Sequence, residues 1–129
     1  MIKMNELSGV CVLVVDDSED LAELTRHWFA SVGAKVVTVS SGAEALVAVA
    51  SQQCHLIVMD IGMPFLDGFA AAEQVRGLGY RMPIIGVTAS VFDDSRWTPN
   101  FDAHFLKPVN KQLLIAAAHA LTHKTLPTA

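Results

Sequence analysis

The chain has 129 residues, of which 52% are hydrophobic and 17% charged, and its formal net charge is −4 at pH 7. This length and composition predict one compact domain, residues 1–129 with a core over about 9–123. Nine Lys and Arg against thirteen Asp and Glu argue against nucleic-acid binding. The first residues lack the apolar core of a secretory signal, and no run is long enough to cross a membrane, so we expect a cytoplasmic protein without membrane contact.

Five short apolar runs are typical of β-strands, and they lie at residues 10–15, 36–39, 56–59, 83–88 and 104–106. Three are continuous rather than alternating, as in strands that are covered on both faces, and the segments between the runs are long enough for helices. The pattern predicts a flavodoxin-like α/β domain, in which a doubly wound sheet of five parallel strands carries helices on both faces. We expect the strand order 2-1-3-4-5.

The segments between the strand runs carry helix signals. The first helix has an apolar face formed by Leu21, Leu24, Trp28, Phe29 and Val32, and we expect it to end at Gly33. Ser41 and Glu44 form a capping-box pattern at the start of the second helix. The third helix is expected from Gly68 through Arg76, and the last begins after Asn110, a favourable N-cap.

Residues 89–102 lack a sustained apolar stripe and contain Pro99, so we expect a short or irregular fourth helix there. Trp97 and Phe101 in this segment are interpreted as local packing residues. Cys11 and Cys54 lie in or beside strand runs and have no CxxC partner, which favours inert buried thiols. We interpret His27, His55, His119 and His123 as solvent-exposed or incidental, and Glu19 and Asp20 as first-turn acids that complement a helix dipole.

Carboxylates follow two of the predicted strands. Asp16 and Asp17 come after the first strand and Asp60 after the third, and the expected order makes these strands neighbours. Ligands of such sheets bind beyond the carboxyl ends of the strands, where the strand order reverses. Like charges this close repel and raise one another's pKa values unless a cation neutralises them. An all-carboxylate donor set favours Mg²⁺, which keeps several waters and leaves a position for a phosphate oxygen.

The fourth and fifth strands also end in polar residues. Thr88 supplies a hydroxyl and Lys107 an ammonium group at the same edge of the sheet. An anion bound by these two groups and by the metal would lie over Asp60, which is the arrangement required for in-line attack on phosphorus. The residues therefore predict that Asp60 becomes an acyl phosphate.

Four motifs in order, VLVVDD, MDIGMPFLDG, PIIGVTA and HFLKP, resemble the receiver domain of two-component response regulators over nearly the whole chain. The resemblance implies that Asp60 is the phosphoryl acceptor, that Asp17 contacts Mg²⁺ directly and Asp16 mostly through water, and that the main-chain carbonyl of Gly62 is a further metal ligand. Thr88 and Lys107 would bind the phosphoryl oxygens.

The resemblance extends to the residues around this site. Ala89 matches the small residue that leaves the phosphate site open, and the Lys107–Pro108 bond matches a peptide bond that is usually cis in the family. Met63, Pro64, Asp67 and Gly68 match the turn after the acceptor strand. One position departs from the pattern: His104 stands where the family usually has an inward-rotating Tyr or Phe that acts with Thr88 as a switch. We associate a histidine there with receivers attached to hybrid kinases.

The resemblance implies a signalling domain rather than an enzyme. It would take a phosphoryl group from a histidine kinase or a histidine phosphotransfer protein, hydrolyse it slowly, and switch a surface that binds a downstream protein or a second copy of the chain. Three alternatives stay open. A degenerate receiver could act as a scaffold, a phosphatase of the haloacid dehalogenase type would need an acid where Gly62 stands, and a flavin carrier would need a less acidic loop after the first strand.

Overall fold

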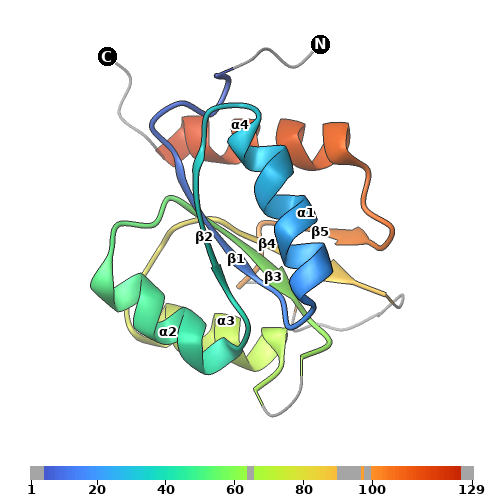
Figure 1. Cartoon of the computed structure of the whole chain (residues 1–129). Coiled ribbons are helices and arrows are strands. Elements are labelled where there is room, and N and C mark those ends of the chain that lie inside the picture. Colours follow the sequence, from blue (N-terminus) through green and yellow to red (C-terminus); the bar gives the residue numbers. More distant parts are fainter. Residues whose placement is uncertain (1–4, 64–65, 90–96, 98–99, 126–129) are drawn as a thin grey trace.

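The computed structural model describes residues 5–63, 66–89, 97 and 100–125. Along this part of the chain the elements are β1 (Cys11–Val15), α1 (Glu19–Ala30), β2 (Lys35–Val39), α2 (Gly42–Ser51), β3 (Leu56–Asp60), α3 (Gly68–Gly77), β4 (Ile84–Thr88), β5 (Ala103–Leu106) and α4 (Lys111–Thr125) (Figure 1). The first and last residues of every strand lie within one residue of the predicted positions. Within the described ranges, no helix has the length and apolar character needed to span a membrane.

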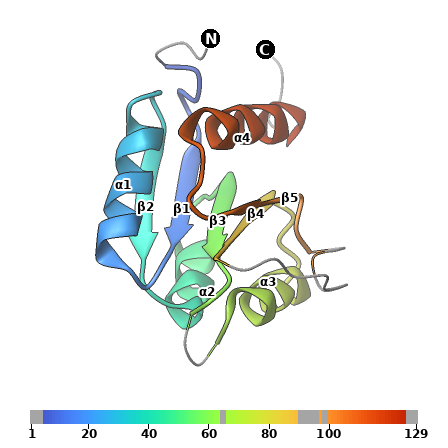
Figure 2. The ribbon, with the colours of Figure 1, turned by 90° about the vertical axis from the view of Figure 1, so that its right-hand side faces the viewer.

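The strands form one sheet in the order β2-β1-β3-β4-β5, and every neighbouring pair is parallel. Helices α1 and α4 cover one face of this sheet and α2 and α3 cover the other (Figures 1 and 2). The three central strands are buried at every residue, whereas the edge strands β2 and β5 are partly exposed. The predicted doubly wound fold and strand order are therefore confirmed.

An aromatic cluster packs against the α2/α3 face of the sheet, and it comprises Phe69, Trp97 and Phe101. The ring centroid of Trp97 lies 4.7 Å from that of Phe69 and 5.0 Å from that of Phe101, both in edge-to-face geometry. Gly86 of β4 makes room for this cluster, since a Cβ atom there would lie 2.4 Å from Cζ3 of Trp97. Trp97 and Phe101 are buried, as the interpretation of local packing requires.

The side chain of Arg76 bonds to residues that precede β4 and to residues that precede β5. Its guanidinium donates to the carbonyl oxygens of Tyr80, Met82 and Asn100 at 3.2, 2.7 and 3.0 Å, and it pairs with Oδ2 of Asp102 at 3.3 Å. Burial lowers the pKa of Arg76, and the charge of Asp102 opposes this effect. The short or irregular helix expected within 89–102 falls largely on residues 90–96 and 98–99, which lie outside the described residues.

The predicted face of α1 was partly wrong. The buried side of the helix runs through Ala22 and Phe29, which are seven residues and about two turns apart, whereas Leu21 and Leu24 are 40% and 45% exposed. The regular helix runs to Ala30, and Gly33 closes its C-terminal end as predicted. The amide of Gly33 donates to the carbonyl oxygen of Ala30 at 3.1 Å, and the amide of Ala34 donates to that of Phe29 at 3.2 Å. Gly33 has a φ of +94°, a left-handed conformation that favours glycine.

The predicted helix starts are confirmed, with one change. Oγ of Ser41 accepts from the amide of Glu44 at 3.1 Å, but the Glu44 carboxylate accepts from the amide of Ser40 rather than that of Ser41. Oδ1 of Asn110 accepts from the amide of Leu113 at 3.0 Å at the start of α4. Glu19 and Asp20 lie in the first turn of α1.

The cysteines are free thiols, and burial raises the pKa of Cys54 to about 11, which keeps this thiol protonated at neutral pH. Two histidines differ from the prediction. Nδ1 of His55 accepts from the amide of Cys11 at 2.9 Å, and Nε2 of His119 pairs with Oε1 of Glu6 at 2.8 Å. Both partners are far away in the sequence, so no local pattern could indicate them.

Candidate functional site

The predicted site residues lie at one edge of the sheet, because parallel strands present their carboxyl ends there. Asp16 follows β1 directly, Asp60 is the last residue of β3, and Thr88 is the last residue of β4. The register pairs Val15 with Met59 and Asp60 with Val87, which brings these ends side by side. Lys107 follows β5, and its amide donates to the carbonyl oxygen of Thr88 at 2.7 Å.

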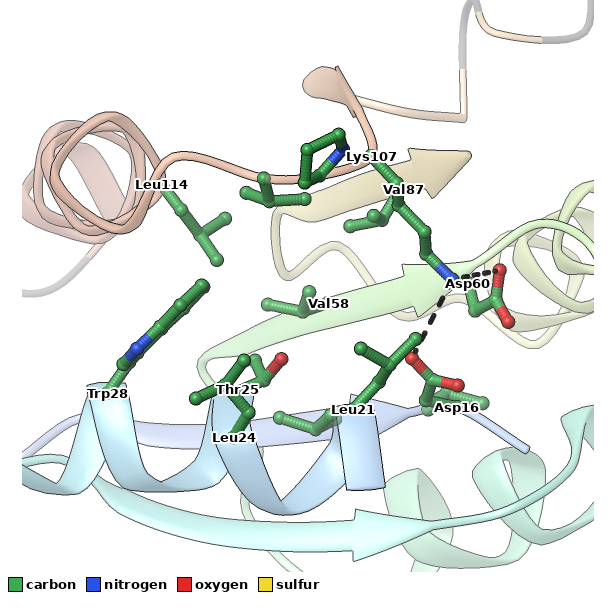
Figure 3. A pocket seen from close by; sticks show the side chains of 14 residues that line it. Asp16, Leu21, Leu24, Thr25, Trp28, Val58, Asp60, Val87, Lys107 and Leu114 are labelled. Atoms are coloured by element: carbon green, nitrogen blue, oxygen red, sulfur yellow. Dashed lines mark ion pairs between the residues drawn. The ribbon is translucent and has the colours of Figure 1, made fainter. Parts of the chain in front are cut away.

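The ammonium group of Lys107 lies between two buried carboxylates. Its Nζ atom is 3.4 Å from Oδ1 of Asp60 and 4.0 Å from Oδ2 of Asp16 (Figure 3). The Lys107–Pro108 peptide bond is cis, as the resemblance implied. This lysine offers the positive charge that an anion bound over Asp60 would need.

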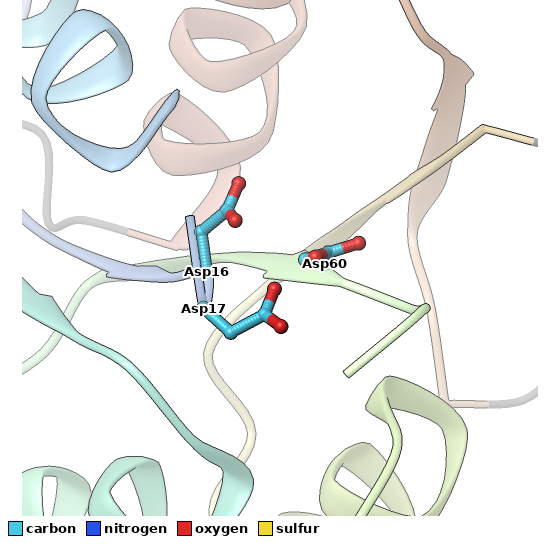
Figure 4. A group of neighbouring side chains, drawn as sticks. All are labelled: Asp16, Asp17 and Asp60. Atoms are coloured by element: carbon cyan, nitrogen blue, oxygen red, sulfur yellow. The ribbon is translucent and has the colours of Figure 1, made fainter. Parts of the chain in front are cut away.

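Asp16, Asp17 and Asp60 form the acidic cluster that the sequence predicted. Each contributes a carboxylate oxygen, and these three oxygens lie within 4.8 Å of one another (Figure 4). Asp16 and Asp60 are buried, whereas Asp17 is exposed to solvent. Oxygen donors at this spacing, with one open to water, suit a hard divalent cation such as Mg²⁺.

The pKa of Asp16 is raised above its ordinary value in this cluster. Burial is the largest cause that raises its pKa, and the charges of Asp60 and Asp17 raise it further. The amide of Ser18, which donates to Oδ1 of Asp16 at 2.9 Å, and the charge of Lys107 oppose the rise. The apo site therefore holds its negative charge at a cost that a bound cation would remove.

Two glycines follow Asp60 and serve different purposes. The amide of Gly62 donates to Oδ1 of Asp60 at 3.1 Å, and an added Cβ there would lie 3.9 Å from the same oxygen, which is an ordinary contact. At Gly68 an added Cβ would lie 2.5 Å from the carbonyl oxygen of Asp60, so only glycine fits. Close backbone contact at Gly68 thus holds the start of α3 against the end of β3, where Asp60 lies.

Thr88 is buried at the end of β4, and Ala89 beside it is exposed. His104 lies on β5 with its side chain exposed, and its ring stacks on Trp97 with a centroid separation of 4.2 Å and an interplanar angle of 13°. His104 therefore packs against the aromatic cluster of the α2/α3 face. Sequence reasoning did not find this contact, because the partner is a loop residue.

A cavity of about 520 Å³ adjoins the acidic cluster between α1 and α4. Its walls are mostly apolar and include Leu21, Leu24, Trp28 and Leu114, and it reaches Asp16, Asp60 and Lys107 (Figure 3). This cavity could not be predicted from the sequence, because the apolar periodicity places Leu21 and Leu24 on the buried face of α1.

A parallel doubly wound domain of this kind belongs to the class of α/β proteins that bind their ligands beyond the carboxyl ends of the strands, where the carboxylate cluster and Lys107 lie here. Residues 12–119 match the family model of the response regulator receiver domain, and the chain belongs to this family. It is a receiver domain of two-component signal transduction. This match favours the receiver over the phosphatase and flavin-carrier alternatives.

The chain is 34% identical over 122 residues to the response regulator MprA of Mycobacterium tuberculosis, which covers 92% of this chain and 53% of that protein. It is 28% identical over 114 residues to the sensor histidine kinase RcsC of Escherichia coli, with 86% of this chain and 12% of that protein covered. The chain thus spans about half the length of MprA and a small part of RcsC.

Among solved structures, the response regulator TrrA of Thermotoga maritima in complex with Mg²⁺ and BeF superposes with a TM-score of 0.81 at 28% identity. The alignment covers 87% of this chain and 98% of that chain.

Proposed function

We propose that Asp60 of this chain accepts a phosphoryl group from a phosphorylated histidine of a kinase or a phosphotransfer protein. The acidic cluster with Lys107 beside it is the observation that carries the proposal, because one site then holds a nucleophile, a cation-binding set and a positive charge for the transferred group. The domain would work as one unit over residues 1–129, with its core over about 9–123, in the cytoplasm expected from the sequence.

In the proposed reaction, a carboxylate oxygen of Asp60 attacks phosphorus and the P–N bond to the donor imidazole breaks. The acyl phosphate is later hydrolysed by water, which releases inorganic phosphate and restores the carboxylate. Asp16, Asp17, Asp60 and the carbonyl of Gly62 would hold Mg²⁺, which would supply positive charge to the phosphoryl oxygens. Lys107 would neutralise a phosphoryl oxygen, Thr88 would donate a hydrogen bond to another, and Ala89 would leave room for them.

Phosphorylation replaces the Asp60 carboxylate with a more negative and bulkier group, which biases a two-state equilibrium at the surface built from β4, β5 and α4. Thr88 and His104 would be the switch residues, and the stacking of His104 on Trp97 would couple the switch to the aromatic cluster. The output would pass to a downstream protein or to a second copy of the chain. No other catalytic activity is proposed.

The α1 side of the cavity is the proposed docking surface for the donor. Leu21 and Leu24 are exposed apolar side chains beside the cavity that reaches Asp60, so a donor that covers them brings its histidine close to the acceptor. Apolar burial there would provide affinity, and the site itself would provide the chemistry.

Replacing Asp60 with Asn tests the proposal, because the amide cannot act as the nucleophile. The wild-type chain incubated with acetyl phosphate and Mg²⁺ should gain one phosphoryl group by intact-mass measurement, and Asp60→Asn should gain none. Asp20→Asn, which changes an exposed acid in the first turn of α1, is the matched control and should be labelled like the wild type. Undiminished labelling of Asp60→Asn would contradict the proposal.

A further inference from the structure

The cavity on the α1/α4 face runs from an apolar end to a charged end. Trp28 and Leu114 lie at the apolar end, and Asp16, Asp60 and Lys107 lie at the other (Figure 3). Its volume of about 520 Å³ falls within the range of about 300–1,000 Å³ that is typical of small-molecule sites. The proposed phosphoryl transfer uses the charged end, and no step of it uses the end at Trp28.

The apolar part of the cavity is built from regular secondary structure. The sheet contributes Val14, Val58 and Val87 from its three central strands, and all three side chains are buried. Trp28 borders the cavity from α1, and Leu114 borders it from α4. A rigid apolar body such as an aromatic ring therefore meets a pre-formed surface, which lowers the entropic cost of binding.

The charged end carries more negative than positive charge. Among the described residues that line the cavity, the charged ones are Asp16, Asp60 and Lys107, and Asp17 lies beside them in the acidic cluster. Nζ of Lys107 is 3.4 Å from Asp60 and 4.0 Å from Asp16, so two carboxylates share this one ammonium group. When no metal is bound, this end therefore attracts a further cation, whereas an anionic head group would meet both carboxylates.

We propose that the cavity binds a small amphipathic amine, whose aromatic body lies toward Trp28 and whose ammonium group meets the carboxylates of Asp16 and Asp60. Burial of the aromatic body removes apolar surface from water and contributes most of the affinity. An aromatic body suits this end of the cavity, because aromatic rings pack favourably against one another. Charge-assisted hydrogen bonds from the ammonium group to the carboxylates set the orientation.

The bound amine competes with Mg²⁺. Its ammonium group neutralises carboxylates that the metal ion also needs, so each ligand weakens the binding of the other. The binding itself requires only the cavity and the carboxylates. Its effect on phosphoryl transfer rests on the proposed function, because a chain that holds the amine would accept a phosphoryl group slowly at limiting Mg²⁺.

A series of probes with one apolar body and different head groups tests the proposal in the whole, metal-free chain. The probes are phenylbutylamine, phenylbutanol and phenylbutyrate, and calorimetry measures their affinities. The amine should bind at one site per chain and about tenfold more tightly than the alcohol, and the carboxylate should bind most weakly. Phenethylamine, which is two methylenes shorter, should bind about fifteenfold more weakly than phenylbutylamine, since each buried methylene contributes about fourfold.

The two tryptophans of the chain locate the bound amine by NMR. The indole N–H signal of Trp28 should shift during the titration, whereas that of Trp97 on the opposite face of the sheet should not. Thr25→Trp places a large side chain at the cavity wall and should abolish binding. Val47→Trp adds the same ring at an exposed position of α2, so this matched control should bind like the wild type.

Circular dichroism confirms that each variant is folded, and the probe series on the wild type decides the proposal without any variant. Absence of saturable amine binding would overturn it, as would equal affinities for the amine and the alcohol or a shift of the Trp97 signal alone. Binding by Thr25→Trp that equals binding by Val47→Trp would also overturn it.

Competition with Mg²⁺ separates this proposal from the proposed function. Millimolar Mg²⁺ should weaken amine binding, and the amine should slow labelling by acetyl phosphate at limiting Mg²⁺. An amine affinity that Mg²⁺ leaves unchanged, or labelling that is equally fast with the amine bound, would overturn the competition. A wild type that is not labelled even without the amine would contradict the proposed function alone, because the binding measurements use no phosphoryl donor.

Discussion

The two faces of the sheet are covered in different ways. On the α2/α3 face, Trp97 fills the space above Gly86 and packs edge to face with its aromatic neighbours. On the α1/α4 face, a cavity of about 520 Å³ is lined by residues of both helices and reaches Asp60. On one face aromatic rings fill the space against the sheet, whereas the other face leaves a cavity next to Asp60. The contrast suggests that the first face supplies stability and the second supplies access.

Removing Trp97 should have the largest effect on stability. Trp97→Ala deletes a buried ring from the aromatic cluster, and such changes cost about 3–5 kcal/mol. Trp28→Ala on the opposite face should cost less, because the Trp28 side chain is half-buried and already borders the cavity. Urea denaturation followed by far-UV circular dichroism measures both free energies of unfolding. Equal losses would remove the contrast between the faces.

A methyl group at Gly86 should have the next largest effect. Gly86→Ala places a Cβ atom 2.4 Å from Cζ3 of Trp97, and overpacking of this kind costs about 1–3 kcal/mol. Gly77→Ala, where an added Cβ meets nothing within 4 Å, is the control and should leave stability unchanged or raise it slightly. Trp97→Leu combined with Gly86→Ala should be less destabilising than the sum of the two single changes, since the smaller side chain vacates the space.

Replacing Asp16 in the acidic cluster should raise the stability of the folded chain. Asp16 has a raised pKa in the folded chain, mainly because it is buried, so its contribution to stability is complete below the ordinary value near 3.8 and is lost as the pH rises through the folded-state pKa. Asp16→Asn should therefore be more stable than the wild type at pH 7 without metal, by about 1 kcal/mol. Thermal unfolding of both chains from pH 3 to pH 7 measures the difference.

In the presence of Mg²⁺ the wild type should become more stable than Asp16→Asn. Added Mg²⁺ should stabilise the wild type, because it binds the charged cluster of the folded chain, and should stabilise Asp16→Asn much less. A metal-free wild type as stable as Asp16→Asn throughout this pH range would show that the cluster is not under electrostatic stress.

The smallest change in stability is expected at Leu24. Because its side chain is 45% exposed, Leu24→Ser should change the free energy of unfolding by no more than about 0.5 kcal/mol. It should nevertheless slow phosphoryl transfer from a protein donor, while labelling by acetyl phosphate stays unchanged. Val47→Ser on α2, which is 68% exposed, is the matched control and should affect neither reaction.

The sequence allowed the fold and the acidic cluster to be predicted because both follow from local patterns. The apolar runs locate the strand ends, and the strand order then brings Asp16, Asp17 and Asp60 together. The contacts of Arg76 with Asn100 and of Trp97 with Gly86 could not be predicted, because they join segments whose spacing in three dimensions depends on packing. Leu21 and Leu24 were misplaced because apolar periodicity cannot distinguish a buried face from one that borders a cavity.

The strands that carry the residues of the candidate site differ in how many neighbouring strands they pair with. The aspartates stand on or directly after β1 and β3, each of which has a neighbour on both sides, whereas Lys107 follows β5, which pairs only with β4. Edge strands open more readily than central ones, so local fraying would withdraw the lysine while the carboxylates stayed in place. Hydrogen exchange at the amide of Lys107, which donates to the carbonyl oxygen of Thr88, should then outpace that at Val14 and Val58. A chain with this edge open would still hold a cation and yet have lost its charge partner for the anion.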